Sequence, residues 1–512
     1  MVGLKDSGHG RLHLQSSLSI VDVFSQQIVV GLTLSAEIEL HSIISAAQNF
    51  EDQSWPLTVQ GRSSAPNPGL SVVALLAVYV SQHIYRWRNP KCSGALPPGS
   101  MGLPMIGESL QYGPIFKTNV AGRPVIITAD PEFNHFLLRQ DGKLVDTWSM
   151  DTFAEVFDQA SQSSKKYTRH LTLNHFGVES LKEKLLPQME DMVCETLRKW
   201  SSEESIEVKG AAVTVSIELN HLPCMTNTWL HVQELHFDIF LPWQMTINFA
   251  AKQIFSGGLE NAPLNISEMF KDLVEGLMSF PINIPGTAHH KCLQIHKKVR
   301  KMMKDVVQKR LAAPERTQGD LLDHIIQDMD TETYIKEDFV VQLMFGLLFV
   351  TSDSISTTLA LAFKLLAEHP AVLEELTVIN EVLRLGNIAP GFFRRALKDI
   401  PVNGYTIPEG WVIMIATAAL HLNSNQFEDP LAFNPWRWKN IQPSVVSKCF
   451  MPFGSGMKQC AGAEYSRVLL ATFLHVLVTK YRWAMVKGGK IVRAPIIRFP
   501  DGFHFKISEK SN

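Results

Sequence analysis

One segment near the C-terminal end, Phe453–Gly462, constrains the fold more than any other part of the chain. It reads FGSGMKQCAG and places Cys460 just before a helical pattern that starts at Ala463. The glycines at 454, 456 and 462 predict tight turns with positive φ and a close approach of the backbone to a flat group. Free amide N–H groups at a helix start favour a thiolate. The segment therefore predicts a cysteine that ligates iron, and a buried cysteine after a glycine loop is the alternative.

These residues resemble the haem-binding loop of cytochrome P450 enzymes, with Phe453, Gly456, Cys460 and Gly462 at the positions of the family's motif. The resemblance implies haem b (iron protoporphyrin IX) with Cys460 as the axial iron ligand, an arrangement that promotes O–O cleavage. Lys458 stands where the family usually has an arginine for a haem propionate. Because a lysine keeps the charge but loses the bidentate fork, we expect a weaker contact there.

Glu381 and Arg384 lie three positions apart in INEVLRL, so a helix would place them on one face. Taken alone, such a pair is a solvated surface contact that adds little stability. Arg437 follows in the Trp-rich stretch FNPWRW. In this order before the cysteine segment, the three residues resemble the family's ExxR helix and its partner arginine, which implies a buried network that holds the haem loop. Between them, Asn403-Gly404 separates two apolar runs and predicts a β-hairpin.

The run 339–366 is apolar nearly all round, as in a helix buried in a protein core. Within it, Asp353 and Ser354 stand mid-helix, where a carboxylate and a hydroxyl are costly without partners. The structural alternative is a serine bonded to its own helix and an aspartate facing a neighbour. The resemblance implies an acid–alcohol pair that relays protons during oxygen activation, a task open to serine because a hydroxyl both donates and accepts. Haem-thiolate isomerases that do not use O2 often lack this pair, so its presence favours a monooxygenase.

The segment Gly69–Tyr85 carries the membrane prediction. About 17 helical residues cover about 25 Å of a hydrocarbon core of about 30 Å, near the lower limit for a span. Basic residues follow at 86, 88 and 91, and the positive-inside rule then places the remaining chain in the cytosol. Residues 95–104, ALPPGSMGLP, predict a Pro-rich hinge before a haem-thiolate domain at 105–512. Microsomal P450 enzymes begin in this way, which implies an endoplasmic reticulum anchor.

The composition excludes other classes. With 512 residues, 45% of them apolar, and a net charge of -2, the chain can bury a large core and has no basic surplus for nucleic acid. Its six cysteines show no pairing pattern and suit a reducing compartment. The sequence has no GxGxxG unit, so electrons from NADPH would come through a separate partner, NADPH-cytochrome P450 reductase.

Strings such as YRWRNPKC, YGPIFKTN and AEHPAVLEEL resemble a plant 87-like group of the P450 family whose members oxidise triterpenes or sterols. At the family's substrate-facing positions, each of which could equally be plain core, stand Phe345, Leu348, Phe349, Ala389, Gly391, Phe392 and Ile497. By the same resemblance, Arg169 and Arg394 contact the haem propionates. For His421, haem contact and core packing are equal alternatives, and Lys165 occupies a place usually held by an aromatic residue or histidine.

Four departures from the family pattern bear on activity. Residues 1–68 precede the usual start and do not resemble a mitochondrial transit peptide, so they are an atypical extension or an artefact of the gene model. Residues 215–244 interrupt a continuous pattern, and their ends fit an in-frame retained intron, with a lipid-facing insert as the alternative. Stretches that family members carry are missing after residues 111 and 377, which leaves about eight residues between the long helix and the ExxR helix.

The sequence thus predicts a mainly α protein with a small β region, the cytochrome P450 fold, and an N-terminal membrane anchor. The expected function is hydroxylation of a hydrophobic polycyclic substrate, a triterpenoid or sterol, with O2 and electrons from NADPH. The alternatives are a splice-altered, inactive relative that at most binds a hydrophobic ligand and, third, a haem isomerase.

Overall fold

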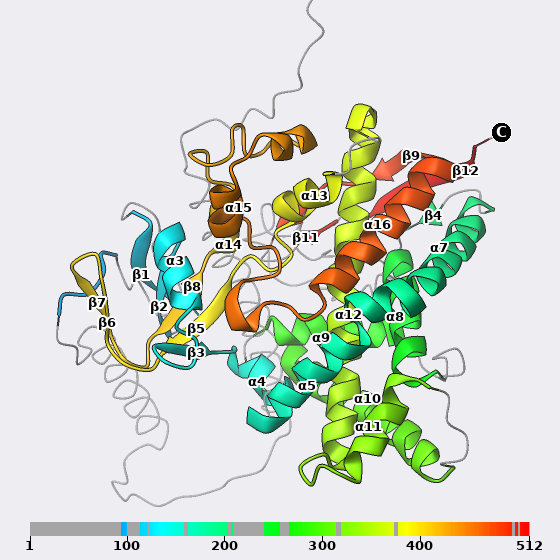
Figure 1. The fold of residues 1–512 in the computed structure, drawn as a ribbon, viewed down its shortest axis with the longest axis horizontal. Helices are drawn as coiled ribbons and strands as arrows, with labels where there is room; N and C mark the ends of the chain where they lie inside the picture. The colour runs from blue at the N-terminus through cyan, green and yellow to red at the C-terminus, as the bar shows by residue number, and fades with distance from the viewer. Residues whose placement is uncertain are drawn as a thin grey trace, which may run out of the picture.

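A computed structural model of the chain describes residues 94–99, 113–120, 123–157, 162–202, 206–207, 240–256, 266–279, 281–313, 319–372, 377–493, 497–499 and 502–510. Helices make up the larger part of the molecule, and a smaller part rich in strands lies to its left (Figure 1). The segment that leads into α16, orange in the same view, lies where the two parts meet. The fold is therefore mainly α with a small β region, as the sequence predicted.

The helices are α3 (Pro131–Leu138), α4 (Asp151–Phe157), α5 (Gln162–His175), α6 (Val178–Ser180), α7 (Leu186–Ser201), α8 (Phe240–Phe255), α9 (Ile266–Leu277), α10 (Ala288–Leu311), α11 (Leu321–Met329), α12 (Glu337–Glu368), α13 (Val378–Gly386), α14 (Thr417–His421), α15 (Pro443–Cys449) and α16 (Ala463–Lys480). A π-helical turn, η1, covers Leu181–Leu185, and 3-10 turns cover η3 (Pro370–Val372), η4 (Pro435–Lys439) and η5 (Gly456–Lys458).

Helix α12 is the longest described helix and runs through the helical part (Figure 1). Its first turn carries Glu337 and Asp338, whose charges complement the helix dipole. It ends before Pro370, because proline cannot continue a helix. Contacts with α8, α10, α13 and α16 surround it. Within the described residues, α12 alone is long and apolar enough to span a membrane, and its packing makes it the core helix predicted for 339–366.

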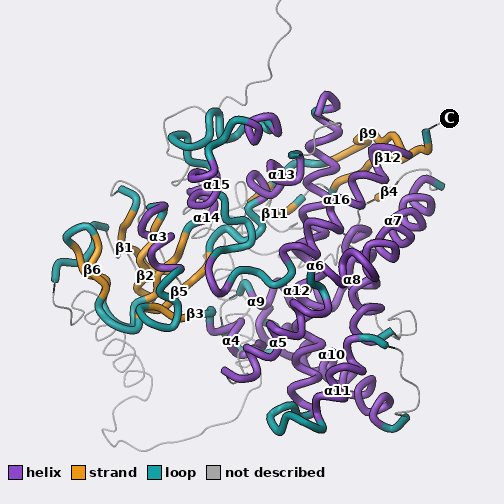
Figure 2. The backbone as a smooth tube through the Cα atoms, viewed as in Figure 1, coloured by secondary structure: helices purple, strands orange, loops and turns teal. Residues whose placement is uncertain are grey.

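The strands form four small sheets (Figure 2). The largest has the order β1 (Ile115–Val120), β2 (Arg123–Thr128), β8 (Val412–Ile415), β5 (Phe392–Ala396) and β3 (Val145–Thr147), in which only β2 and β8 are parallel. The others are β4 (Ile206–Glu207) with β12 (Phe503–Glu509) and β9 (Tyr481–Gly488), β10 (Val492–Arg493) with β11 (Ile497–Arg498), and β6 (Ile400–Val402) with β7 (Tyr405–Ile407).

The hairpin predicted at Asn403-Gly404 is confirmed. These two residues join β6 to β7 with φ values of 47° and 81°. Positive φ at both central positions is the geometry of a two-residue type I′ turn, which asparagine and glycine tolerate best.

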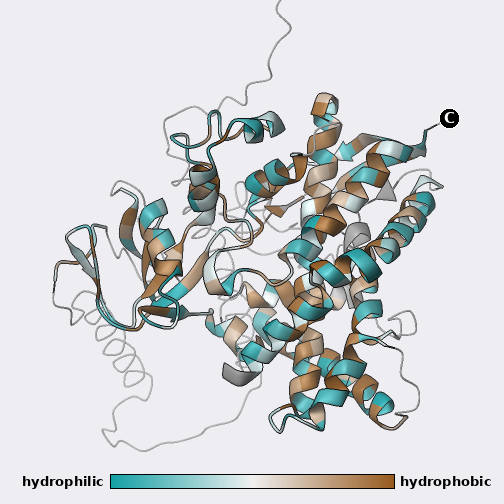
Figure 3. Cartoon of the chain, viewed as in Figure 1, coloured by the Kyte–Doolittle hydropathy of each residue, from teal (hydrophilic) through white to brown (hydrophobic). Residues whose placement is uncertain are grey.

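The main hydrophobic core lies among the helices. Trp200, Phe363, Phe473 and Phe505 meet there with ring centroids 4.6 to 6.3 Å apart. They come from α7, α12, α16 and β12, so this cluster joins the C-terminal sheet to the helices. Brown apolar residues follow α12 and alternate with polar ones on the outer helices (Figure 3).

The end of α13 is held by a residue far along the chain. Arg493 in β10 donates to the carbonyl oxygens of Leu385 and Gly386, which a helix end would otherwise leave without partners. Burial lowers the pKa of Arg493 to about 10, so this guanidinium remains charged at neutral pH.

The predicted domain boundaries fall mostly outside the described residues. The extension 1–68, the anchor 69–85 and residues 215–239 of the suspected insert lie there, as do 100–104 of the hinge. Residues 240–244 of that insert form the start of α8. The connector that the sequence predicts to be shortened follows η3 and includes residues 373–376, which lie outside the described residues, before α13.

Candidate functional site

A cavity of about 660 Å³ lies between the middle of α12 and the cysteine segment. On the α12 side it is lined by Leu347, Val350, Thr351, Ser354, Ile355 and Thr358. On the opposite side stand Phe453, Gly454, Ser455, Lys458, Cys460, Ala461 and Gly462. A volume within about 300–1,000 Å³ is typical of ligand and cofactor pockets.

The cysteine segment folds as a tight loop. Gly454 and Gly456 have φ values of 70° and 72°, as predicted, and a Cβ at Gly456 would lie 2.6 Å from the carbonyl oxygen of Leu138. The Cys460 amide donates to the carbonyl oxygen of Phe453 at 2.9 Å. The prediction of positive φ was wrong for Gly462, whose φ is -88° because it is the N-cap of α16.

Cys460 precedes α16, and its accessible surface borders the cavity. The expectation that the helix start favours the thiolate holds only in part. Burial by surrounding protein raises the pKa of the Cys460 thiol, while the Gly462 backbone and the Arg169 guanidinium act in the opposite direction. Arg169 also donates to the carbonyl oxygen of Gln459 at 2.6 Å, which ties α5 to the cysteine loop.

The structure brings Glu381, Arg384 and Arg437 together in a buried network. Arg384 donates through Nε to Glu381 Oε2 at 2.9 Å and through Nη2 to Oε1 at 2.7 Å. Arg437 Nε donates to the same Oε1 at 3.0 Å. Neither Glu381 nor Arg384 is exposed at all, so this pair is not a surface contact.

The carboxylate of Glu381 has two further donors that sequence reasoning missed. Trp438 Nε1 donates to Oε2 at 3.0 Å and the Asn434 amide donates to Oε1 at 3.1 Å. The guanidinium groups of Arg384 and Arg437 also donate to backbone carbonyl oxygens between residues 421 and 432. One buried carboxylate thus fixes the segment that precedes the cysteine loop.

On α12, Ser354 lines the cavity and its Oγ donates to the Val350 carbonyl oxygen at 3.1 Å. Asp353 is half-buried and is not among the residues that line the cavity. Thr351 and Thr358 line it as well, and each donates to a carbonyl oxygen of the preceding turn. Sequence reasoning missed both threonines, although spacings of three and four residues from Ser354 place them on the same helix face.

Two basic side chains border the cavity, Lys458 and Arg394, whereas Arg169 does not. Arg394 is buried and its Nε lies 3.1 Å from Asp141 Oδ1 in an ion pair. His421 is also at the cavity wall, but both of its ring nitrogens have protein partners. Lys165 on α5 is exposed.

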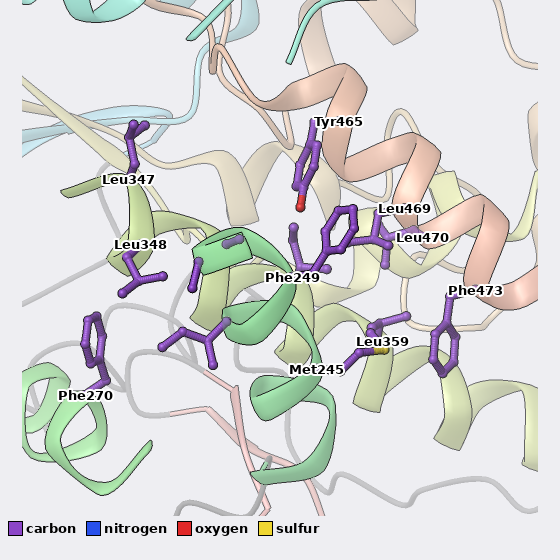
Figure 4. Close-up of a cluster of buried hydrophobic side chains, with 14 of the residues drawn as sticks. Met245, Phe249, Phe270, Leu347, Leu348, Leu359, Tyr465, Leu469, Leu470 and Phe473 are labelled. Atoms are coloured by element: carbon purple, nitrogen blue, oxygen red, sulfur yellow. The ribbon is translucent and has the colours of Figure 1, made fainter. Parts of the chain in front are cut away.

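Of the seven expected substrate-facing residues, Ala389 and Phe392 line this cavity. The structure places Phe345, Leu348 and Ile497 in the main core, each at most 2% exposed. Phe349 packs with them, and Gly391 is held between Met414 and the Ile415 carbonyl. Figure 4 shows Leu348 beside Phe270 in the core. For Phe345, Leu348, Phe349 and Ile497, the structure gives the alternative, core packing.

Comparisons with known proteins agree with this geometry. A family model described as cytochrome P450 matches residues 109–377 and 376–498. The chain belongs to the cytochrome P450 family. The two matched segments of this P450 meet just before α13, where the sequence predicts a shortened connector. A β-amyrin 16-α-hydroxylase of Maesa lanceolata is 39% identical over 86% of this chain and 99% of the relative. A cucurbitadienol 11-hydroxylase of Siraitia grosvenorii is 39% identical, with the same coverage.

Solved structures show the same fold. A retinoic-acid-bound cyanobacterial cytochrome P450 superposes with a TM-score of 0.68 at 22% identity, covering 82% of this chain and all of that one. The haem domain of a second P450, a triple mutant, gives 0.61 at 17% identity, with 78% and 90% covered. The family match and the similarity to the two hydroxylases identify a cytochrome P450 monooxygenase, and the family implies haem.

The cavity of this P450 fits the haem that the family implies. Its described lining contains no aspartate or glutamate and includes Lys458, whose charge complements a group that carries carboxylates. Arg394 also lies in the lining, and its charge is paired with Asp141. The rest of the lining is mainly apolar, and Cys460 offers a sulfur at the wall. Gly454 lies in this wall without a side chain, whereas Gly456 is not among the lining residues. The residue types and their placement therefore suit a flat, largely apolar cofactor held by a thiolate.

Proposed function

We propose that this P450 hydroxylates a polycyclic triterpenoid or sterol, using O2 and electrons delivered from NADPH by a separate reductase. The observation that carries the proposal is the cavity with Cys460 on one wall and Ser354 on the other. The similarity to hydroxylases of β-amyrin and cucurbitadienol supports the substrate class. When bound, haem supplies the activation of O2 and the oxidation of a C–H bond.

The residues of the cysteine loop would hold the cofactor. Cys460 would supply a thiolate, and Lys458 and Arg394 would provide positive charge for the two carboxylates. Phe453 and the backbone at Gly462 would shape the wall next to the sulfur. The Glu381, Arg384 and Arg437 network fixes the chain that leads to this loop, since breaking a buried ion network is strongly destabilising.

Ser354 and Asp353 would move protons into the cavity. The Ser354 hydroxyl donates to the Val350 carbonyl and can still accept a hydrogen bond through its oxygen lone pairs. Rotation about χ1 would turn the same O–H towards the cavity. Thr351 and Thr358 extend the hydroxyl-bearing face by one turn in each direction.

The substrate would contact apolar wall. Val350 is 58% exposed although it lies mid-helix in the core, because its side chain borders the cavity. With Ala389 and Phe392 it offers apolar surface to a ligand. For a rigid polycycle, most of the binding free energy would come from burying such surface, at about 25 cal/mol per Å².

We also propose that residues 69–85 anchor the protein in the endoplasmic reticulum membrane with the catalytic domain in the cytosol, and that 215–244 are a retained-intron insert. The second candidate function is an inactive relative that binds a hydrophobic ligand. One observation favours it, namely that the family match breaks at residues 376–377, where the connector is short.

Microsomes that contain this chain and a plant P450 reductase would test the proposal. We expect a thiolate-type Soret band in the reduced carbon monoxide complex and NADPH-dependent hydroxylation of β-amyrin or cucurbitadienol. A chain with that spectrum and no product from a panel of triterpenes and sterols would refute the substrate class. Substrate-induced spectral shifts without turnover would instead support the ligand-binding alternative.

A further inference from the structure

His421, the last residue of α14, has two well-defined partners. It is 1% exposed, its Nδ1 lies 2.6 Å from Asn387 Oδ1, and its Nε2 lies 2.9 Å from the Met451 amide nitrogen. Because a backbone N–H can only donate, Nε2 must accept, and Nδ1 must carry the proton. The amide of Asn387 agrees with this assignment, since its Nδ2 donates to the Arg384 carbonyl oxygen at 2.8 Å and leaves Oδ1 to face His421.

This imidazole is neutral as well as fixed in one tautomer. Burial and the nearby Arg384 guanidinium lower the pKa of His421 to about 3. Neither ring nitrogen has a free hydrogen-bonding position for a further ligand. A carboxylate that approached Nε2 would have to displace the Met451 amide, which would then be buried without an acceptor.

The partners of His421 connect the ion network to the cysteine loop. Asn387 ends α13 in the left-handed region, with φ 45°, and the Arg384 guanidinium donates to the His421 carbonyl oxygen at 2.9 Å. On the other side, the Met451 carbonyl oxygen accepts from the Gly454 amide at 3.1 Å. The next contact is the bond from the Cys460 amide to Phe453.

We propose that His421 is a positioning residue for Cys460, which couples the end of α13 to the cysteine loop and makes no contact with haem carboxylates. The proposal rests on the proposed role of Cys460 as the iron ligand. Removing the imidazole leaves the Met451 amide without its acceptor. Such a loss should change a local opening equilibrium about tenfold, which corresponds to about 1.4 kcal/mol.

The test uses the purified, haem-loaded full chain. His421→Phe keeps a ring of similar size but removes both nitrogens. We expect amide hydrogen exchange in a peptide covering 451–460 to accelerate about tenfold, and the reduced carbon monoxide complex to shift towards the form without thiolate ligation. His475→Phe, at an exposed position on α16, is the matched control and should change neither measurement.

Two further variants keep the result decisive. His421→Gln can still accept from the Met451 amide, so exchange should be slower than in His421→Phe. If the phenylalanine variant does not fold, His421→Gln is compared with the wild-type chain, and a tenfold acceleration in this acceptor-retaining variant would overturn the proposal. Glycine at position 387 tolerates the positive φ, and Asn387→Gly removes the oxygen that accepts from the His421 Nδ1–H. The double variant with His421→Phe should exchange only slightly faster than His421→Phe alone. Unchanged exchange in His421→Phe with weakened haem binding would overturn the proposal in favour of a haem contact. The exchange measurement is independent of turnover, so a failed substrate assignment would not affect it.

Discussion

Replacement of Glu381 by glutamine is the sharpest test of the buried network. The carboxylate accepts five hydrogen bonds, three at Oε1 from Arg384, Arg437 and Asn434 and two at Oε2 from Arg384 and Trp438. An amide keeps one acceptor oxygen and presents N–H groups at the other position. At least two buried donors therefore lose their acceptor, and one of them belongs to a guanidinium.

Each lost acceptor costs about 1–3 kcal/mol, or about 2–6 kcal/mol for the two. Removal of one member of a buried ion pair typically costs about 3–5 kcal/mol. The two figures agree, so we expect Glu381→Gln to lower the free energy of unfolding by about 4 kcal/mol. That loss is a large share of the about 5–15 kcal/mol that stabilises a protein, and haem content per unit of protein should fall with it.

The assay is urea unfolding of the haem-loaded chain, followed by the Soret band and tryptophan fluorescence. Glu368→Gln, which removes an exposed ion pair with Lys364 on α12, makes the same chemical change as a control. Such pairs contribute about 0.3–0.5 kcal/mol, so its midpoint should barely move. Equal midpoints for the two variants would show that the network does not stabilise this fold as argued.

Four other outcomes follow. Cys460→Ser should abolish the thiolate-type Soret band of the reduced carbon monoxide complex, and an unchanged band would contradict the ligand assignment. Ser354→Ala should retain haem but release more hydrogen peroxide per NADPH, because the ordered proton path is lost; unchanged coupling would contradict this role. A chain without residues 215–244 and with both shortened segments restored should load more haem, and equal loading would mean that these departures are tolerated. Burial lowers the pKa of His175 and His296 to about 4, so between pH 6.5 and pH 4 the unfolded chain binds more protons than the folded chain. The urea concentration at the unfolding midpoint should therefore decrease as the pH is lowered from 6.5 to 4, and it should decrease less in a variant with glutamine at both positions.

The sequence was most informative where spacing alone determines geometry. The three-residue separation of Glu381 and Arg384 placed them on one face of α13, and Asn403-Gly404 set the hairpin turn. Positive φ at Gly454 and Gly456 was predictable because a run of glycines around a cysteine favours tight turns. Gly462 was misread because helix N-caps also favour glycine, at negative φ.

Side-chain direction on α12 was harder to predict. A helix that is apolar all round has no polar face to mark solvent, so its sequence does not say which residues face a cavity. Phe345 and Leu348 therefore could not be told from Val350, which does border it. The partners of His421 were equally hidden, since Asn387 and Met451 lie 34 residues before and 30 residues after it.

The cap that Arg493 places on the end of α13 has a consequence for biosynthesis. Glu381 and Cys460 are both translated before that arginine, yet α13 has its last carbonyls satisfied only once β10 has formed. Folding during synthesis proceeds from the N-terminus, so the helix that anchors the site would stay incomplete until nearly the whole chain has left the ribosome. Cofactor insertion would then be a late event, and a nascent chain that stopped short of residue 493 would contain every cofactor-binding residue named above and still lack a finished site.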